Sequence, residues 1–276
     1  MTRLDDIRAV SRGDYWSTFG RRWSTLLTYR YLGRTNPVLD CGANVITMPL
    51  RHDMRNERGG VMAAPLCIAA AESGGMHDDT HVPNPVTASL QILDAAHGVK
   101  RIQVIPETLR LGRSMGFSRS LIVDADVPER VIALSSGSAI SRGRPPEGYE
   151  RVENPPLPVE NSPSMPRLHE VFDIRRICAG VWEIAALDEP NASPDAALHL
   201  GPQHIALEAA AAELAGQGAQ ARSWQMMFLA RGQIGPFRTR ATLHGDSGAW
   251  VGVRVDLTDA GNADRLISTA SASFER

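Results

Sequence analysis

Apolar residues follow two periodicities along the chain, and these predict where helices and strands lie. Near the N-terminus a stripe at helical spacing predicts one amphipathic helix that packs on the body of the protein; its members are Trp16, Phe19, Trp23, Leu26 and Leu27. Two Ala-rich runs, at residues 59–71 and 201–214, predict two further helices. Each run follows a predicted strand, at residues 45–50 and 176–184, and then a polar loop.

Strand-like runs follow each Ala-rich helix, so the same order of elements occurs twice. The runs cover residues 86–93, 101–111, 117–123 and 130–140 in the first copy, and 223–230, 237–243, 249–257 and 265–274 in the second. Single residues also align: Gln91 corresponds to Gln225, an offset of 134 residues, and Asp124 to Asp256, an offset of 132. A duplication of strand, loop, helix and four strands predicts an α+β fold.

The duplication predicts four segments. Residues 1–37 form an N-terminal helical extension, 38–143 the first copy, 144–168 a linker, and 169–276 the second copy. Prolines are concentrated in the linker, which favours a semi-extended chain over a folded element.

Composition narrows the class of protein. Of the 276 residues, 43% are hydrophobic and 22% are charged, as in ordinary globular proteins, and the net charge of −2 predicts no basic surface for nucleic acid. No apolar run is long enough to cross a membrane, and the first residues lack the apolar core of a signal peptide. Cys41, Cys67 and Cys178 lie far apart and without zinc spacing. We therefore expect a cytoplasmic protein that binds neither nucleic acid nor membrane.

The second Ala-rich run carries the most specific chemical signal. Gly201-Pro202 opens this helix, because proline is tolerated in a first turn where its missing N–H breaks no helical bond. Glu208 is the one acid between Leu198 and Ala212. A carboxylate beside the free N–H groups of a helix start is a pairing that acyl-transfer chemistry uses. A Glu on the solvated face of an amphipathic helix is the alternative explanation of the same pattern.

The motifs around Glu208 resemble those of the hotdog fold, in which a curved antiparallel sheet wraps a central helix. The chain is most similar to the thioesterase superfamily of the phenylacetate-pathway type and its acyl-CoA thioesterase relatives. In that family His-Gly-Gly starts the central helix and a catalytic Asp or Glu follows. His199-Leu200-Gly201 matches this start in the second copy, and Glu208 matches the acid, nine residues after the His. In the first copy Arg58 and Cys67 stand at the corresponding positions.

This resemblance implies a tandem, or double, hotdog: two curved antiparallel sheets that each wrap a central helix. It implies hydrolysis of acyl-CoA-type thioesters, with Glu208 as general base or nucleophile. N–H groups at the start of the same helix, from Gly201 or Gln203, would hold the thioester oxygen. His199 and Asn191 would orient the carbonyl or the attacking water.

The resemblance also implies that the first copy supplies a wall of the site and that cations hold the phosphates of CoA. Candidates for the wall are Gln91, Asn56 and Arg58. Candidates for the phosphates are Arg113, Arg110, Arg119 and Arg231. We expect no metal and no cofactor beyond the CoA of the substrate. Members of the superfamily pair back to back, so a homodimer of double hotdogs is expected.

Two alternatives share the fold. The first copy has lost both the His and the carboxylate, so a non-catalytic protein that binds acyl-CoA or acts as a scaffold is the main one. A hotdog dehydratase or hydratase is the other, although the sequence has no Asp-x-x-x-x-His motif on a helix.

Two serine motifs suggest a hydrolase of another class. Ser114, in Gly112–Gly116, fits the pattern of a nucleophile elbow, and Ser247, in Gly245–Gly248, resembles the nucleophile segment of trypsin-like proteases. Both segments fall where hairpin turns are predicted, because paired glycines suit tight turns. A serine hydrolase therefore ranks below the thioesterase.

Cys67 is a candidate thiol nucleophile with His77 or His81 as its base, and the His77–His81 segment is a candidate metal site. A lone Cys in an Ala-rich helix is more typical of a packed core. A His- and Asp-rich segment after Gly74-Gly75 is more typical of a solvated loop, so neither alternative is favoured.

Overall fold

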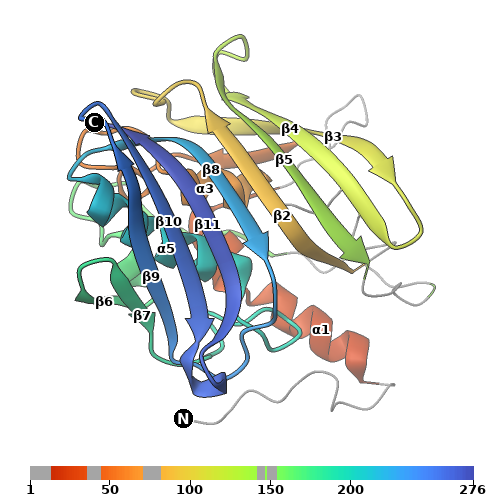
Figure 1. Ribbon diagram of the computed structural model, residues 1–276. Helices are drawn as coiled ribbons and strands as arrows, with labels where there is room; N and C mark the ends of the chain where they lie inside the picture. The colour runs from red at the N-terminus through yellow and green to blue at the C-terminus, as the bar shows by residue number, and fades with distance from the viewer. Residues whose placement is uncertain (1–13, 36–44, 71–81, 142–146, 148–153) are drawn as a thin grey trace.

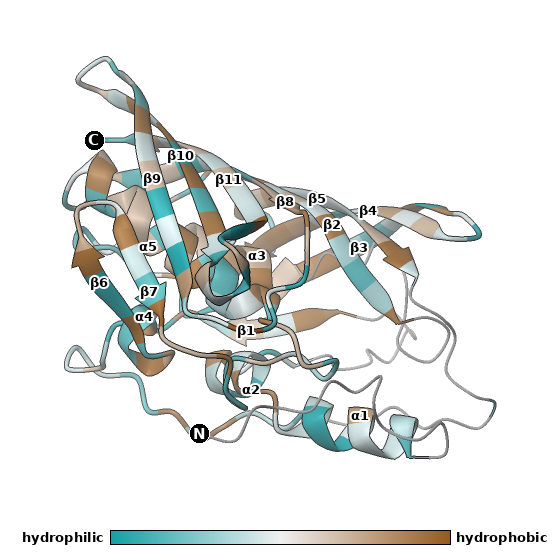
Figure 2. Cartoon of the chain, turned by 60° about the horizontal axis from the view of Figure 1, so that its bottom comes forward, coloured by the Kyte–Doolittle hydropathy of each residue, from teal (hydrophilic) through white to brown (hydrophobic). Residues whose placement is uncertain are grey.

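The computed structural model describes residues 14–35, 45–70, 82–141, 147 and 154–276. These residues build one antiparallel sheet of eleven strands in the order β1-β3-β4-β5-β2-β8-β11-β10-β9-β7-β6, with two helices, α3 and α5, against one of its faces (Figure 1). Figure 2 shows α3 and α5 beneath the sheet, with α1 and α2 beyond them.

The two halves of the sheet have the same topology. The elements of the first half are β1 (Ile46–Pro49), α3 (Ala63–Ala70), β2 (Pro83–Ile92), β3 (Arg101–Leu111), β4 (Met115–Asp124) and β5 (Val131–Ser141). Those of the second are β7 (Val181–Ile184), α5 (Leu200–Ala215), β8 (Gln220–Phe228), β9 (Phe237–Asp246), β10 (Trp250–Asp259) and β11 (Arg265–Glu275). Strand order is β1-β3-β4-β5-β2 in the first half and β7-β9-β10-β11-β8 in the second, so each strand has a counterpart at the same place.

The halves join where β2 pairs with β8. Leu90 lies opposite Trp224, and the neighbouring pairs are Ser89 with Gln225 and Gln91 with Ser223. A two-fold axis through the Leu90–Trp224 pair exchanges Gln91 and Gln225, which reproduces the offset of 134 residues found in the sequence. Antiparallel pairing thus makes the sheet continuous across the duplication.

Strand patterns explain which face the helices cover. Along β10, Val251, Val253, Val255 and Leu257 are buried, while Arg254 between them is exposed. Because burial alternates with a period of two residues, one face of the sheet points toward the helices and the other toward solvent. All eight residues of α3 are buried, which is why its sequence is apolar on every side rather than amphipathic.

Two segments differ from the sequence prediction. The single N-terminal helix is two, α1 (Tyr15–Ser24) and α2 (Leu27–Leu32), because Leu26 has an extended ψ of 108° that turns the chain. The turn lets α2 bury Tyr29, Tyr31 and Leu32. The strand predicted at 176–184 is likewise two, β6 (Ile174–Cys178) and β7, which pair as a hairpin around Gly180 at a φ of +70°.

The remaining described elements are short. Residues 154–167 of the predicted linker form neither helix nor strand, and they lead into α4 (Leu168–Val171). Two 3₁₀ turns complete the list, η2 (His52–Met54) and η3 (Ala260–Asn262). Among the described residues no helix is long and apolar enough to span a membrane.

Candidate functional site

Glu208 lies at the junction of the two halves. It projects from the third turn of α5, and only 2% of the residue is exposed. Its Oε1 accepts a hydrogen bond from the backbone N–H of Ala63 at 2.6 Å, and its Oε2 accepts one from Ala64 at 2.7 Å. Ala63 and Ala64 are the first residues of α3, so the acid of the second half meets the helix start of the first.

This pairing differs from the predicted one, in which Glu208 works with the start of its own helix. Glu208 is the seventh residue after Gly201, and a rise of about 1.5 Å per residue puts their backbones about 10 Å apart along α5. The carboxylate therefore cannot share an oxyanion hole with Gly201. The N–H donors that it meets belong to Ala63 and Ala64 instead.

The environment of Glu208 tunes its acidity. Burial raises the pKa of Glu208 to about 7, while the hydrogen bonds from Ala64 and Ala63 favour the ionised form and act in the opposite direction. A carboxylate with a pKa near 7 can take up and release a proton at neutral pH. That property suits a general base, and the start of α3 supplies N–H donors and the positive end of a helix dipole beside it.

The loop that leads into α3 is organised by Asn56. Its Oδ1 accepts hydrogen bonds from the N–H groups of Arg58, at 3.0 Å, and Gly60, at 2.9 Å. Its Nδ2 donates to the carbonyl of Ala219, at 3.3 Å, and to Gln220 Oε1, at 3.2 Å. Asn56 therefore shapes the turn before the helix and ties it to the second half of the molecule.

Gln220, at the start of β8, completes this connection. Its Nε2 donates to the carbonyl of Val61 at 2.9 Å. A Cβ atom at Gly60 would overlap Gln220 Oε1, so a larger residue there would displace the end of the Gln220 side chain. Gly60 thus favours the close contact between the halves.

The start of α5 is closed by the N-terminal extension. His199 caps this helix, because its Nδ1 accepts the N–H of Gly201 at 3.2 Å, and the same atom lies 3.1 Å from Thr28 Oγ1 of α2. A Cβ at Gly201 would overlap the side chain of Thr28, and Tyr29 packs edge-on against the His199 ring. The helix start that was predicted to bind substrate is therefore covered by α2.

Three other buried side chains surround this closed helix start. The backbone carbonyl of Asn191 accepts the backbone N–H of His199, at 2.8 Å, and Gln203 Nε2 donates to the backbone carbonyl of Leu198. The amide oxygens of Asn191 and Gln203 have no hydrogen-bond partner among the described residues, and neither do the ring nitrogens of His204. Burial lowers the pKa of both His199 and His204 to about 3, so both rings stay neutral.

Other predicted residues lie away from Glu208. Gln91 is exposed on β2 between the buried Leu90 and Ile92, so it points to the face of the sheet opposite the helices. Arg58 is exposed, and its side chain passes over Gly218. Arg113 is exposed in the turn between β3 and β4.

Both serine motifs are hairpin turns, as predicted. The N–H of Gly112 donates to the carbonyl of Met115 in the turn that holds Ser114. In the turn between β9 and β10 the N–H of Ser247 donates to the carbonyl of Trp250, which also accepts from Ser247 Oγ at 3.3 Å. The elbow motif requires a helix after the serine, and β4 follows Ser114 instead.

Cys67 is buried in α3 among the core residues, in keeping with a packing role. The bases and metal ligands proposed with it, His77 and His81, lie outside the described residues, as does Cys41. Among the described residues no group of three or more His, Cys, Asp or Glu side chains is arranged to hold a metal ion.

Comparison with known proteins identifies the fold. No protein-family model matches the sequence, and no curated protein matches it. The structure is similar to an acyl-CoA thioesterase II, TesB2, of Mycobacterium marinum, with a TM-score of 0.57 and 13% identity over 90% of this chain and 97% of that one. A conserved protein of unknown function with a hot dog fold from Alicyclobacillus acidocaldarius gives a TM-score of 0.54 at 12% identity, covering 91% and 98%.

A third similar structure is the 12:0-ACP thioesterase of Umbellularia californica, with a TM-score of 0.52 and 9% identity over 84% of this chain and 93% of that one. At such identities the likeness establishes the fold. The predicted hotdog fold is therefore confirmed, with its antiparallel sheet packed against helices.

Sequence reasoning missed the partners of Glu208. Ala63 and Ala64 contribute only backbone N–H groups, and these cannot be inferred from the type of side chain. Gln220 and Thr28 are polar residues inside otherwise unremarkable segments. The one available signal is the Gly59-Gly60 pair before α3, because glycine permits a close approach, but the pair does not identify the approaching residue.

Proposed function

We propose that this protein hydrolyses acyl thioesters and that its two halves form a tandem hotdog with one active site, at Glu208. The observation that carries the proposal is the buried Glu208 carboxylate of α5, held by the N–H groups of Ala63 and Ala64 at the start of α3. It combines a base with a pKa near 7 and a pair of oriented donors. Acyl transfer requires both.

In the proposed reaction the thioester carbonyl oxygen replaces Glu208 as the acceptor of at least one of the two N–H groups, those of Ala63 and Ala64. The ionised Glu208 then removes a proton from a water molecule as this water attacks the carbonyl carbon. Negative charge moves to the carbonyl oxygen, where the donors at Ala63 and Ala64 stabilise it. The C–S bond then breaks, the protonated Glu208 returns its proton to the departing thiolate, and the carboxylic acid is released. Direct attack by Glu208, followed by hydrolysis of the resulting anhydride, is the covalent variant of the same scheme.

The counterpart site, at the start of α5, is inactive in this proposal. His199, Gly201 and Asn191 hold the helix start together, and α2 covers it through Thr28. Cys67 stands where the counterpart of Glu208 would be, so this site also lacks a carboxylate.

The substrate class follows from the chemistry of the site and from its structural neighbours. One neighbour is named an acyl-CoA thioesterase and another a 12:0-ACP thioesterase. We propose a thioester of CoA or of a carrier protein that bears the same pantetheine arm.

A non-catalytic role is the second candidate, and one observation favours it. Glu208 already occupies both N–H donors and is only 2% exposed. A carboxylate in this position also caps α3 and locks the two halves together, as an acid at any helix start does. A protein that binds acyl-CoA without hydrolysing it would keep such a cap.

Replacing Glu208 by Gln separates the two candidates. Gln has nearly the same shape but cannot accept a proton, so hydrolysis should fall by about 10²-fold or more in kcat while binding of the thioester persists. The rate of thiol release from a panel of acyl-CoA thioesters measures this.

The matched control is Glu213→Gln on the same helix. Glu213 pairs with Arg176 and Trp182 at the surface, so this variant should keep the wild-type rate. Equal rates in wild type and Glu208→Gln would refute the catalytic assignment. Retention of CoA thioester by both, without turnover, would favour the binding role.

A further inference from the structure

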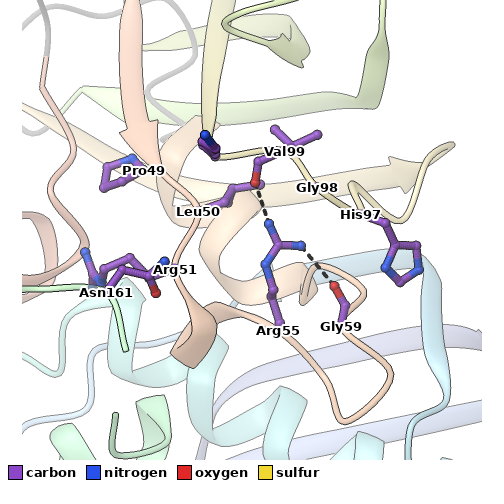
Figure 3. Close-up of a pocket in the computed structure, with 10 residues that line it drawn as sticks. Pro49, Leu50, Arg51, Arg55, Gly59, His97, Gly98, Val99 and Asn161 are labelled. Carbon is purple, nitrogen blue, oxygen red and sulfur yellow. Dashed lines mark hydrogen bonds between the residues drawn. The ribbon is translucent and has the colours of Figure 1, made fainter. Parts of the chain in front are cut away.

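A second polar site lies beside the loop that leads into α3. A pocket of about 460 Å³ opens there between that loop and the turn that connects β2 to β3 (Figure 3). Its lining includes four basic side chains, Arg51, Arg55, His97 and Lys100, and no carboxylate among the described residues.

Arg55 is fixed in this pocket without an acidic partner. Its guanidinium donates to the backbone carbonyls of Gly59 and Ala96, both at 2.9 Å, and of Val99 at 2.6 Å (Figure 3 shows the bonds to Gly59 and Val99). An arginine has five N–H donors, so two remain for a ligand. Burial lowers the pKa of Arg55, and no carboxylate among the described residues pairs with it.

Lys100 adds a second uncompensated cation. It is exposed at the pocket, it forms no ion pair with a described residue, and it is the only lysine in the sequence. His97 is also exposed, and its ring lies over Gly59. The pocket therefore concentrates positive charge in a protein whose net charge is −2.

Acids near this pocket are already paired, and one of them, Asp53, pairs with Arg51 of the pocket lining itself. Asp53 is buried with Arg51, at 3.4 Å, and Asp94 pairs with Arg130, at 2.8 Å. Glu57 in the adjoining loop lies 3.6 Å from Arg167. An incoming anion is therefore the remaining partner for Arg55 and Lys100.

The pocket is connected to the proposed active site by a short stretch of chain. Gly59 lines the pocket, and Ala63, four residues later, donates to Glu208. Four residues span at most about 14 Å even when fully extended. The distance from the thioester to the phosphate along an extended pantetheine arm is comparable to this span.

We infer that the pocket around Arg55 and Lys100 binds a phosphate group of the carrier whose thioester reaches Glu208. The inference rests on the proposed function and adds to it the group that anchors the substrate. Guanidinium and ammonium groups suit this role, because charge-assisted hydrogen bonds to phosphate are stronger than neutral ones. The phosphate comes either from CoA itself or from the phosphopantetheine of a carrier protein.

Kinetics with matched substrates test the inference. Lys100→Gln and Arg55→Gln should each raise KM for an acyl-CoA by about tenfold, as loss of one charge-assisted hydrogen bond predicts, with kcat little changed. Lys100→Gln should not alter hydrolysis of the corresponding acyl-pantetheine, which lacks phosphate. Arg254→Gln, which removes an exposed cation from the outer face of β10, should change neither substrate. Equal effects of Lys100→Gln on both substrates, or no effect, would overturn the inference.

A direct measurement separates this inference from the proposed function. Because Lys100 is the only lysine, acylation of its amine by a mild reagent can be followed by mass spectrometry, with the N-terminal amine as internal reference. CoA should protect Lys100, and pantetheine should not. Phosphopantetheine will protect as well as CoA if the pantetheine phosphate is the anchor, and less well if the nucleotide phosphates are.

The outcomes of the two tests are distinct. Protection by CoA without turnover of any thioester would sustain the pocket and refute the hydrolase. Turnover without protection by CoA or phosphopantetheine would sustain the hydrolase and refute the pocket. Arg55→Gln removes three bonds to backbone carbonyls and can weaken the loop, so Lys100→Gln, whose side chain is exposed, is the decisive variant.

Discussion

Glu208 is a buried acid whose charge is supported by backbone alone. The nearest supports are the N–H groups of Ala63 and Ala64, and no basic side chain pairs with it among the described residues. Desolvation therefore outweighs the hydrogen bonds, and the pKa of Glu208 rises to about 7. The residue is poised between its two protonation states at neutral pH.

The pH dependence of hydrolysis should report this pKa. If the ionised carboxylate is the base, kcat/KM rises with pH, with a midpoint near 7, and reaches a plateau above it. His199 and His204 should add no limb above pH 5, because burial lowers the pKa of each to about 3. A rate measured from pH 5 to 9 checks this, and a profile that is flat across pH 7 would contradict it.

The free energy of unfolding should also depend on pH through the Glu208 carboxyl, and its raised pKa fixes the direction of the change. The unfolded chain releases the Glu208 proton near pH 4.5 and the folded protein near 7, so between these values the folded state binds more protons. The stability that this group contributes is full below pH 4.5 and is lost as the pH rises through 7, by roughly 3 kcal/mol. Urea unfolding of wild type and Glu208→Gln at several pH values isolates this contribution. The difference between the two proteins should change across the window, and a constant difference would contradict the raised pKa.

The two central helices differ in what covers their starts. The N–H groups at the start of α3 donate to Glu208 of α5, in the other half of the molecule. The start of α5 is capped by His199 and packs against Thr28 of α2. One helix start therefore meets a carboxylate, and the other is covered by α2. This asymmetry arises in part from α2, which has no counterpart in the repeated elements.

Gly201→Ala tests how tightly α2 closes the start of α5. The added methyl overlaps the Thr28 side chain, so the free energy of unfolding should fall by about 1–3 kcal/mol. Thr28→Ala removes the overlapping atoms, so the same change should cost less in that background. Chemical denaturation of the four proteins of this double-mutant cycle gives the coupling.

Gly245→Ala is the matched control, because a Cβ there meets nothing within 4 Å. It should leave stability nearly unchanged. Equal costs of Gly201→Ala with and without Thr28 would show that α2 does not press on the helix start.

The whole described body is tied together across its two halves. The sheet continues from β2 to β8, Glu208 bonds to α3, and Asn56 with Gln220 links the loop of one half to the strand of the other. These contacts connect the two halves directly. We expect the halves to unfold together rather than one after the other.

Trp224 is the side chain on which to test this cooperativity. It is fully buried on β8, opposite Leu90 at the centre of the junction. Trp224→Ala should lower the free energy of unfolding by about 3–5 kcal/mol and shift a single transition seen equally by circular dichroism and by fluorescence of the other tryptophans. Trp224→Phe, which keeps most of the volume, should cost less. Two separate transitions in the wild type would contradict cooperative unfolding.

Much of the architecture was predictable because it is encoded locally. Apolar residues at period two marked β10, and the Ala-rich runs marked α3 and α5. The offset between Gln91 and Gln225 predicted the duplication, and the two-fold pairing of β2 with β8 gives that offset its geometry. The prediction failed at the break between α1 and α2, because a single extended residue, Leu26, leaves no trace in a helical pattern.

The chain alone marked Glu208 as a candidate, because it is the one acid between Leu198 and Ala212. Apolar periods predicted the order of helices and strands, since these periods depend only on neighbouring residues. The hotdog fold itself was implied by the resemblance of the motifs around Glu208. The helix start that meets Glu208 could be identified only from the fold, because its partners lie 145 and 144 residues away and offer backbone N–H groups rather than side chains. The packing of α2 against the start of α5 was likewise visible only in the fold. Contacts across a two-fold junction depend on how the halves pack, and the periodicity of apolar residues carries no information about that packing.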